Sequence, residues 1–120
     1  MKKIYVGYSR KFDYQKELYE PIRTSELNER FEIVLPHEKS EDLFSSREFF
    51  KSCDYFLAEI TYPSIGLGIE MGWADAVGVK IICLVKNGEN ISKSAVSVAA
   101  DVIEYKNGED LLKQLGEKLK

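Results

Sequence analysis

One acidic residue, Glu70, lies where the sequence predicts a helix that begins just beyond the end of a buried strand. The nearly continuous apolar run at residues 54–60 predicts the strand. Residues 65–77 carry apolar side chains at four-residue spacing, as a helix does. Because open α/β sheets bind ligands at the carboxyl ends of their strands, the Glu70 carboxylate can act there as a nucleophile, a general base or an acceptor for a hydroxyl group. The alternative is structural, since acidic residues are common in the first turns of helices and stabilise the helix N-terminus.

The loop before this helix offers a site for an anion or a hydroxyl group. Ser64 can donate its hydroxyl hydrogen, and the backbone N–H groups from Gly66 to Gly68 lie at a helix N-terminus, where such groups lack intrahelical partners. Glycine also lets a ligand approach the backbone closely. With Gly72 the spacing is GxGxxxG, which is not the GxGxxG fingerprint of dinucleotide-binding folds. The structural alternative is a tight turn from strand to helix, with Ser64 as the N-cap.

Further polar residues follow two other predicted strands. Ser9 and Arg10 come just after the first strand, and a hydroxyl group beside a guanidinium can hold a phosphate. As parts of a solvated loop they need no such role. His37 is the sole histidine and follows Pro36 at the end of the second strand. A single histidine in that place is more often a surface residue than a catalyst.

The composition is that of an ordinary globular protein. The chain has 120 residues, of which 44% are hydrophobic and 31% charged, so we expect one domain over residues 1–120 with a substantial core. The net charge of −3 gives no electrostatic reason to expect nucleic acid or a membrane as a partner, and no apolar run approaches membrane-spanning length. Cys53 and Cys83 are widely separated and Cys83 falls in a predicted core strand, so we expect reduced thiols and a cytoplasmic location. One histidine and two separated cysteines make no metal-ligand cluster, and we expect neither a metal nor a cofactor.

Strands and helices alternate along the chain. Strands are predicted at residues 3–7, 31–35, 54–60, 80–85 and 101–105, and helices at residues 14–30, 45–50, 65–77, 91–98 and after Gly108. Asp13 is the expected N-cap of the first helix, and Pro21 is expected to kink or break it. The alternation predicts an α/β three-layer sandwich with a flavodoxin-like or Rossmann-like five-stranded parallel sheet in the order 2-1-3-4-5. In that order the segment from Gly7 to Arg10 faces the segment from Thr61 to Glu70.

Residues 58–74, AEITYPSIGLGIEMGWA, resemble the nucleoside 2-deoxyribosyltransferase superfamily. Within it the likeness is greater to the 2′-deoxynucleoside 5′-phosphate N-hydrolases, whose central run has the form AEVTxPSxGxGxELGxA. The resemblance implies an α/β enzyme that cleaves or transfers the N-glycosidic bond of a (deoxy)nucleoside 5′-monophosphate or a nucleoside. A nucleotide-binding domain of the same fold, with weak turnover or none, is the alternative.

The resemblance also implies roles for individual residues. Glu70 falls on the nucleophile, which attacks the anomeric carbon of the sugar and forms a glycosyl-enzyme intermediate, and Tyr5 matches a first-strand tyrosine of the transferases. Ser64 falls where the hydrolases have a phosphate-binding serine, which favours a nucleotide over a free nucleoside. Ser9 and Arg10 lie near the phosphate loop of the family.

Two other implications concern a neighbouring subunit and a missing acid. Ser94 resembles a serine that a second subunit contributes to the phosphate pocket, so we expect a homodimer or a larger homo-oligomer. The family carries a catalytic aspartate eight residues before the aspartate that opens the third strand, and counting back from Asp54 reaches Ser46. The candidates to replace that acid at the leaving base are Asp42, Glu48, Glu59 and His37, of which Glu59 and His37 follow strands and are expected near the pocket.

Overall fold

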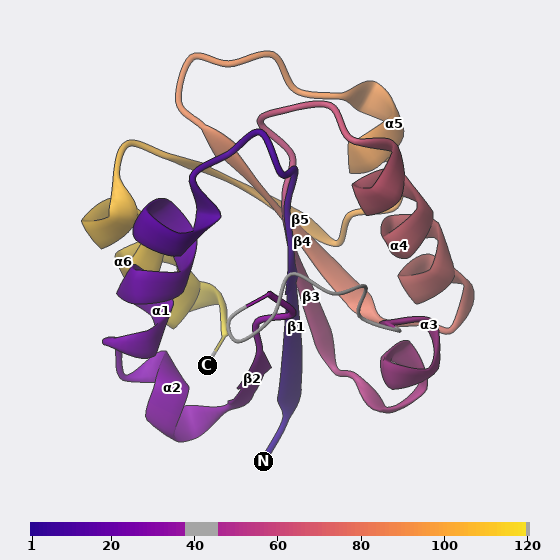
Figure 1. The fold of residues 1–120 in the computed structure, drawn as a ribbon, viewed down its shortest axis with the longest axis horizontal. Coiled ribbons are helices and arrows are strands. Elements are labelled where there is room, and N and C mark those ends of the chain that lie inside the picture. Colours follow the sequence, from indigo (N-terminus) through magenta and orange to yellow (C-terminus); the bar gives the residue numbers. More distant parts are fainter. Residues whose placement is uncertain (38–45, 120) are drawn as a thin grey trace.

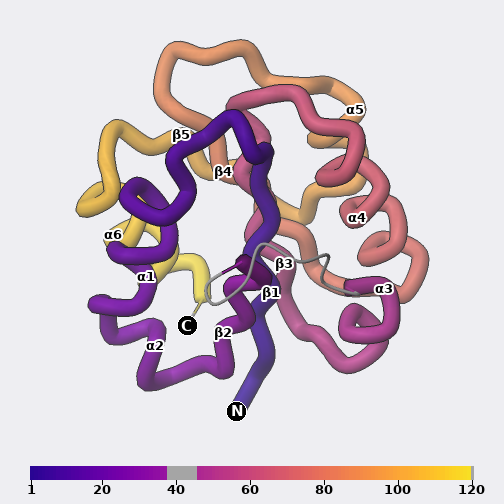
Figure 2. Tube along the Cα trace, in the orientation of Figure 1, coloured from indigo at the N-terminus to yellow at the C-terminus, as the bar shows by residue number. Residues whose placement is uncertain are grey.

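The sheet confirms the predicted fold class and order of strands. The computed structural model describes residues 1–37 and 46–119. Within them the strands are β1 (Lys3–Gly7), β2 (Glu32–Val34), β3 (Tyr55–Glu59), β4 (Lys80–Lys86) and β5 (Asp101–Tyr105). They form one parallel sheet in the order β2-β1-β3-β4-β5. Because β1 and β3 are neighbours, the loops that follow them lie together at one end of the sheet (Figure 2).

Helices cover both faces of this sheet, as the alternating pattern predicted. The described helical elements are η1 (Gln15–Tyr19, a π-helix), α1 (Glu20–Arg23), α2 (Leu27–Arg30), α3 (Ser46–Phe49), η2 (Phe50–Ser52, a 3₁₀-helix), α4 (Ile65–Ala76), α5 (Lys93–Val96) and α6 (Gly108–Lys118). In Figure 1, α1, α2 and α6 lie on one side of the sheet and α3, α4 and α5 on the other. No helix of the described residues is both long enough and apolar enough to span a bilayer.

Alternate residues of β1 enter two different cores, because successive side chains of a strand point to opposite faces. Ile4 and Val6 are fully buried on the side of α1 and α6. Tyr5 points the other way and packs edge-on against Phe56 in the core that also contains Met71 of α4. This alternation places the Tyr5 side chain beneath α4, the helix that carries Glu70.

The predicted first helix is divided into three short pieces. Asp13 Oδ1 accepts a hydrogen bond from Lys16 N at 3.4 Å, which confirms the expected cap. Pro21 lies in the first turn of α1, where its missing N–H costs little. The helix α1 follows directly on the π-helix. The break itself comes at residues 24–26, where Thr24 Oγ1 turns back to donate to Glu20 O at 2.9 Å.

The apolar stripe noted in the sequence over residues 65–77 is not the face of α4 that packs on the sheet. The apolar residues at four-residue spacing lie outside, with Ile65 85%, Ile69 49% and Val77 47% exposed. The buried residues of the helix are Leu67, Met71 and Ala74. Both stripes are apolar, so periodicity alone does not choose between them, and the helix presents an apolar outer face.

Candidate active site

A pocket of about 460 Å³ opens where β1 and β3 end, a size typical of small-molecule sites, which span about 300–1,000 Å³. Its walls come from the end of β1, the residues after β2, the start of α3 and the first three turns of α4. The lining residues are Tyr5, Gly7, Tyr8, Arg10, Pro36, His37, Ser46, Arg47, Ser64, Gly66, Leu67, Ile69, Glu70 and Trp73. The fold therefore brings Tyr5, Gly7, Arg10, His37, Ser64, Gly66 and Glu70, all predicted from the sequence, to one pocket.

The Glu70 carboxylate is held by two hydroxyl groups. Tyr5 Oη donates to Glu70 Oε2 at 2.6 Å, and Ser46 Oγ donates to the same oxygen at 2.7 Å. Glu70 Oε1 accepts no hydrogen bond from the described residues and is left for a ligand. Burial raises the pKa of Tyr5 far above its ordinary value, and the nearby Glu70 charge raises it further. The tyrosine therefore stays protonated and keeps its role as donor.

The position of Glu70 corrects one expectation. It is the sixth residue of α4 and so lies in the second turn, with no acidic residue in the first turn. The field of a helix N-terminus is felt mainly within the first turn. The two hydroxyl donors, rather than the helix end, are what hold this carboxylate.

The loop before α4 combines the structural role of Ser64 with a free donor. Ser64 is the N-cap of α4, since its Oγ accepts a hydrogen bond from Leu67 N at 3.3 Å, and its carbonyl oxygen accepts one from Gly68 N at 3.1 Å. The Leu67 and Gly68 N–H groups therefore already have partners. Of the N–H groups from Gly66 to Gly68 that were expected to bind an anion, only that of Gly66 is available. Its N–H has no partner among the described residues, and an added Cβ would meet nothing within 4 Å.

Gly7 is required by packing rather than by a ligand alone. A Cβ at this position would lie 2.7 Å from Phe56 Cε1 and 3.0 Å from Leu67 Cδ1. Such distances are too short for carbon atoms, so any side chain would push the end of β1 away from α4. The absence of one lets the strand end pass close beneath the helix and brings the two sides of the pocket together.

His37 is part of a hydrogen-bonded chain along the pocket wall. Arg10 Nη2 lies 2.6 Å from His37 Nε2, and His37 Nδ1 lies 2.6 Å from Tyr8 Oη. A guanidinium can only donate, so His37 Nε2 accepts from Arg10 and the ring proton sits on Nδ1, which donates to Tyr8. Tyr8 Oη is in turn 2.5 Å from Tyr19 Oη. This histidine is half-buried and bonded, in contrast to the surface position that its sequence context favours.

Glu59 does not reach the pocket, contrary to the expectation from the sequence. Strand alternation turns its side chain to the opposite face of the sheet from α4, where it is 1% exposed. Its carboxylate accepts hydrogen bonds from Thr61 N at 2.7 Å, from Thr61 Oγ1 at 3.0 Å and from Tyr105 Oη. Burial raises the pKa of Glu59. The residue therefore fixes the start of the loop that carries Ser64.

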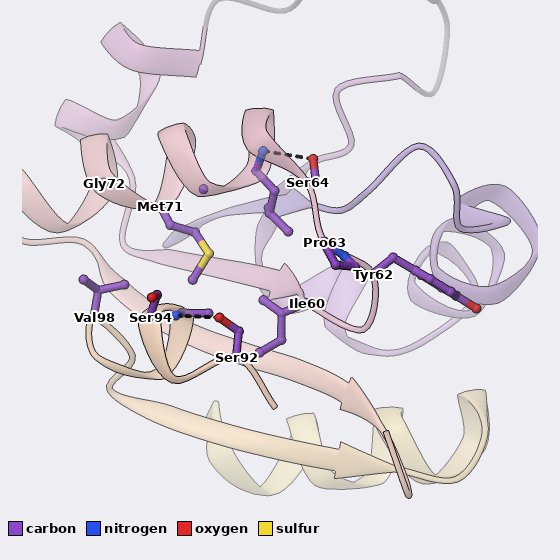
Figure 3. Close-up of a pocket in the computed structure, with 12 residues that line it drawn as sticks. Ile60, Tyr62, Pro63, Ser64, Met71, Gly72, Ser92, Ser94 and Val98 are labelled. Atoms are coloured by element: carbon purple, nitrogen blue, oxygen red, sulfur yellow. Dashed lines mark hydrogen bonds between the residues drawn. The ribbon is translucent and has the colours of Figure 1, made fainter. Parts of the chain in front are cut away.

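Three other predicted site residues also lie outside the pocket. Ser9 is 4% exposed, and its Oγ accepts from Lys11 N at 3.3 Å within the loop. Gly68 and Ser94 line a smaller neighbouring hollow of about 240 Å³ between α4 and α5. Figure 3 shows Met71 extending into this hollow from α4, with Ser92 and Ser94 across from it. Ser64 lines both cavities and forms the wall between them.

Sequence reasoning missed several residues of the pocket. Trp73 was noted only as part of an apolar helical stripe, and Arg47 and Tyr8 carried no motif. Ser46, by contrast, was reached by counting back from Asp54, and it does lie against Glu70. Of the proposed replacement acids, Asp42 lies outside the described residues. Glu48 is exposed and pairs with Lys51 at 3.1 Å, so it is not part of the pocket.

Comparison with curated proteins gives two relatives that carry the same name. No protein-family model matches the chain. The 5-hydroxymethyl-dUMP N-hydrolase of Esox lucius is 32% identical over 83 residues, which are 69% of this chain and 57% of that protein. The 5-hydroxymethyl-dUMP N-hydrolase of Homo sapiens is 34% identical over 68 residues, or 52% of this chain and 39% of that protein. The chain thus spans about half the length of the curated relatives it matches.

A solved structure extends the similarity over nearly the whole chain. The CMP N-glycosidase of Clostridium botulinum superposes with a TM-score of 0.69 at 26% identity, and the match covers 96% of this chain and 99% of that one. The fold of this chain therefore matches the fold of that protein. By its sequence and its fold, the chain belongs to the nucleoside 2-deoxyribosyltransferase superfamily.

Proposed function

We propose that this chain cleaves the N-glycosidic bond of a nucleoside 5′-monophosphate, with Glu70 as the nucleophile. The observation that carries the proposal is the placement of the Glu70 carboxylate in a pocket of nucleotide size. Its Oε2 is held by Tyr5 and Ser46, and its Oε1 accepts no hydrogen bond from residues 1–37 or 46–119. The names of the relatives support it, since 5-hydroxymethyl-dUMP and CMP are both nucleoside 5′-monophosphates.

The reaction takes place in two displacements. Glu70 Oε1 gives an electron pair to the anomeric carbon, and the base leaves with the electrons of the carbon–nitrogen bond. Water, or a second base in a transfer reaction, then attacks the same carbon and releases the carboxylate. The hydroxyl groups of Tyr5 and Ser46 fix the carboxylate for attack and stabilise the negative charge on Oε2 when it is released.

The phosphate binds at the start of α4 in this proposal. The Ser64 hydroxyl and the Gly66 N–H are donors there, the helix N-terminus favours an anion, and the Arg10 guanidinium lies on the facing loop. The site is built for a ligand with a negative group at one end, which distinguishes a nucleotide from a nucleoside.

A panel of ribo- and deoxyribonucleoside 5′-monophosphates, each compared with its nucleoside, tests the proposal. We expect base release, followed by chromatography, from at least one monophosphate and tighter binding of that monophosphate than of the nucleoside. Equal affinity for both, measured by calorimetry, would assign Ser64 and Gly66 to a 5′-hydroxyl group. Absence of base release from every compound would refute the enzymatic proposal.

The second candidate is a nucleotide-binding domain with little turnover. One observation favours it: Ser46 occupies the place beside Glu70 where the family has an aspartate. A hydroxyl group has no readily released proton near neutral pH, so the leaving base receives none from it. The same panel separates the two candidates, because this one binds a monophosphate without releasing a base.

We also propose that the chain works as a homodimer or larger homo-oligomer in the cytoplasm. The exposed apolar residues Ile65, Ile69 and Val77 on the outer face of α4 support assembly, and Ser94 lies on the surface where a second subunit can meet it. Cys53 and Cys83 are free thiols, in keeping with a reducing compartment. A monomeric mass by light scattering, in a sample that retains activity, would refute the assembly.

A further inference from the structure

We propose that Arg47, held against Trp73, receives the leaving base and stabilises its negative charge, in place of the proton that an aspartate would supply. This rests on the proposed function, since it assigns the base-binding end of the same pocket. It adds an electrophilic catalytic residue and a class of base to the reaction.

The direction of α4 fixes which end of the pocket takes the base. With a rise of about 1.5 Å per residue, Glu70 lies about 9 Å along the helix from Ser64, and Trp73 lies about 4.5 Å beyond Glu70. The phosphate and the base are attached to the sugar at different ring carbons, and they extend away from the ring in different directions. A phosphate at Ser64 and an anomeric carbon at Glu70 therefore direct the base toward Trp73.

Arg47 is prepared for a ligand at that end. Its guanidinium lies over the Trp73 ring, 5.8 Å from the ring centroid, a cation–π distance that orients the side chain without using up its N–H groups. Arg47 is exposed and forms no ion pair or hydrogen bond with the described residues. It also follows Ser46 in α3, whose hydroxyl group bonds to Glu70, and both Arg47 and Glu70 line the same pocket.

The other groups that could assist the base are committed elsewhere. Glu59 is on the far face of the sheet, bonded to Thr61 and Tyr105. His37 Nε2 accepts from Arg10, so its ring proton is on Nδ1 and donates to Tyr8 rather than to a ligand. Among the described residues that line the pocket, Arg47 is the cationic donor that remains at the Trp73 end, since Arg10 is bonded to His37.

The step balances without a proton from the protein. Glu70 Oε1 forms a bond to the anomeric carbon, the carbon–nitrogen bond breaks, and the base departs as an anion whose charge spreads onto its ring oxygen and nitrogen atoms. Arg47 donates two N–H groups to those atoms and stays charged throughout. The water that later opens the glycosyl-enzyme gives one proton to the base and its hydroxide to the sugar.

This geometry selects a class of base. A guanidinium presents donors only, so it pairs with an edge that carries a carbonyl oxygen beside a ring nitrogen. Bases with such an edge are the oxo-pyrimidines and the oxo-purines, whereas adenine has no carbonyl oxygen. We therefore expect monophosphates of oxo bases to be the better substrates.

Trp73 itself reports where the base binds, because it is the only tryptophan of the chain. We expect a nucleoside 5′-monophosphate to quench its fluorescence, and ribose 5-phosphate, which lacks a base, to compete for binding without quenching. Binding of the monophosphate by calorimetry with unchanged Trp73 emission would overturn the placement of the base. This measurement needs no turnover, so it stands apart from the enzymatic proposal.

Substitution of Arg47 tests its part in the reaction. Arg47→Met keeps the length of the side chain and removes the donors, and we expect kcat to fall about 100-fold, as when one donor to a developing anion is removed, with a smaller change in KM. The kcat of Arg47→Lys should lie between those of the wild type and Arg47→Met. The matched control is Lys51→Met, which removes a nearby exposed charge outside the pocket and should leave kcat unchanged.

A catalytic role of Arg47 makes the effect of its substitution on kcat depend on the leaving base, which a merely structural role would not do. Among the nucleotides that the wild type cleaves, the fall in kcat caused by Arg47→Met should be largest for the least acidic bases. It should be smallest for the most acidic bases. A loss equal for all bases, or a rate within threefold of the wild type, would overturn the assignment of Arg47. Base release by neither protein would instead contradict the enzymatic proposal.

Discussion

Ser46 Oγ donates a hydrogen bond of 2.7 Å to Oε2 of Glu70, although the two residues are 24 positions apart in the sequence. The contact sets a hydroxyl group against the one carboxylate that lines the described pocket. It also shows that position 46 is within reach of the reacting atoms, so a change of side chain there acts directly on the chemistry.

We predict that Ser46→Asp speeds base release. A carboxyl group beside the Glu70 carboxylate keeps its proton to a higher pH, since two like charges at this distance are costly. It can then protonate the leaving base, an effect typically worth about 10² to 10⁴ in rate. Steady-state rates on the best monophosphate should rise at least tenfold, whereas Ser46→Asn, of the same shape but without an acidic proton, should not. Equal rates for the two variants would contradict the prediction.

Tyr5→Phe tests the other hydroxyl donor. The ring is 2% exposed and packs against Phe50 and Phe56, so phenylalanine keeps the core contacts. Loss of a hydrogen bond to a charged group is worth about 1.5–3 kcal/mol, which corresponds to roughly a ten- to hundredfold fall in kcat if the bond acts in the transition state. Urea unfolding should show a much smaller change. A variant with wild-type kcat would remove Tyr5 from the mechanism.

The fold could be predicted because its signals are local. Apolar runs of five to seven residues alternate with helical patterns, and parallel sheets need such crossovers. The meeting of Tyr5 and Glu70 follows from strand alternation once the order of strands is known. Pattern and topology predicted the fold and the end of the sheet where the pocket lies, whereas the roles of Tyr5 and Glu70 came from the resemblance of residues 58–74 to a known superfamily.

The features that could not be predicted depend on which face of a strand a residue occupies or on contacts between loops. A shift of one residue along a strand exchanges its two faces, and Glu59 falls on the face away from the pocket. The inward stripe of α4, formed by Leu67, Met71 and Ala74, escaped notice because the outer stripe at four-residue spacing is also apolar. The chain from Arg10 through His37 to Tyr8 joins two loops that only the tertiary structure brings together.

A pair of glycine substitutions in α4 tests the binding role of the Gly66 amide. Gly66→Ala and Gly68→Ala both add a methyl group where nothing lies within 4 Å, and each should stabilise the helix by up to about 1 kcal/mol. Only Gly66 lines the pocket that contains Glu70. Calorimetry should therefore show weaker binding of a monophosphate for Gly66→Ala alone. Similar losses in both variants would assign the effect to helix geometry instead.

Glu59→Gln should change how stability depends on pH. Burial raises the pKa of Glu59 above its ordinary value of 4.5 in the folded protein, so the folded state binds more protons than the unfolded state above that pH. The free energy of unfolding therefore falls as pH rises through this range, by up to about 1.4 kcal/mol per pH unit. Urea titrations at several pH values above 4.5 should give a steeper fall for the wild type than for Glu59→Gln. Parallel curves would contradict this account of the buried carboxylate.

The substitution Glu70→Gln is the most direct test of the mechanism. Glutamine has the same shape, and its amide oxygen can still accept hydrogen bonds from Tyr5 and Ser46, but it is not a nucleophile. Base release from the best monophosphate should be measured for both proteins at saturating substrate, with binding checked by Trp73 fluorescence. The mechanism predicts retained binding and a rate lower by on the order of a thousandfold or more, as for other removed nucleophiles. Base release by Glu70→Gln at a rate close to that of the wild type would contradict it.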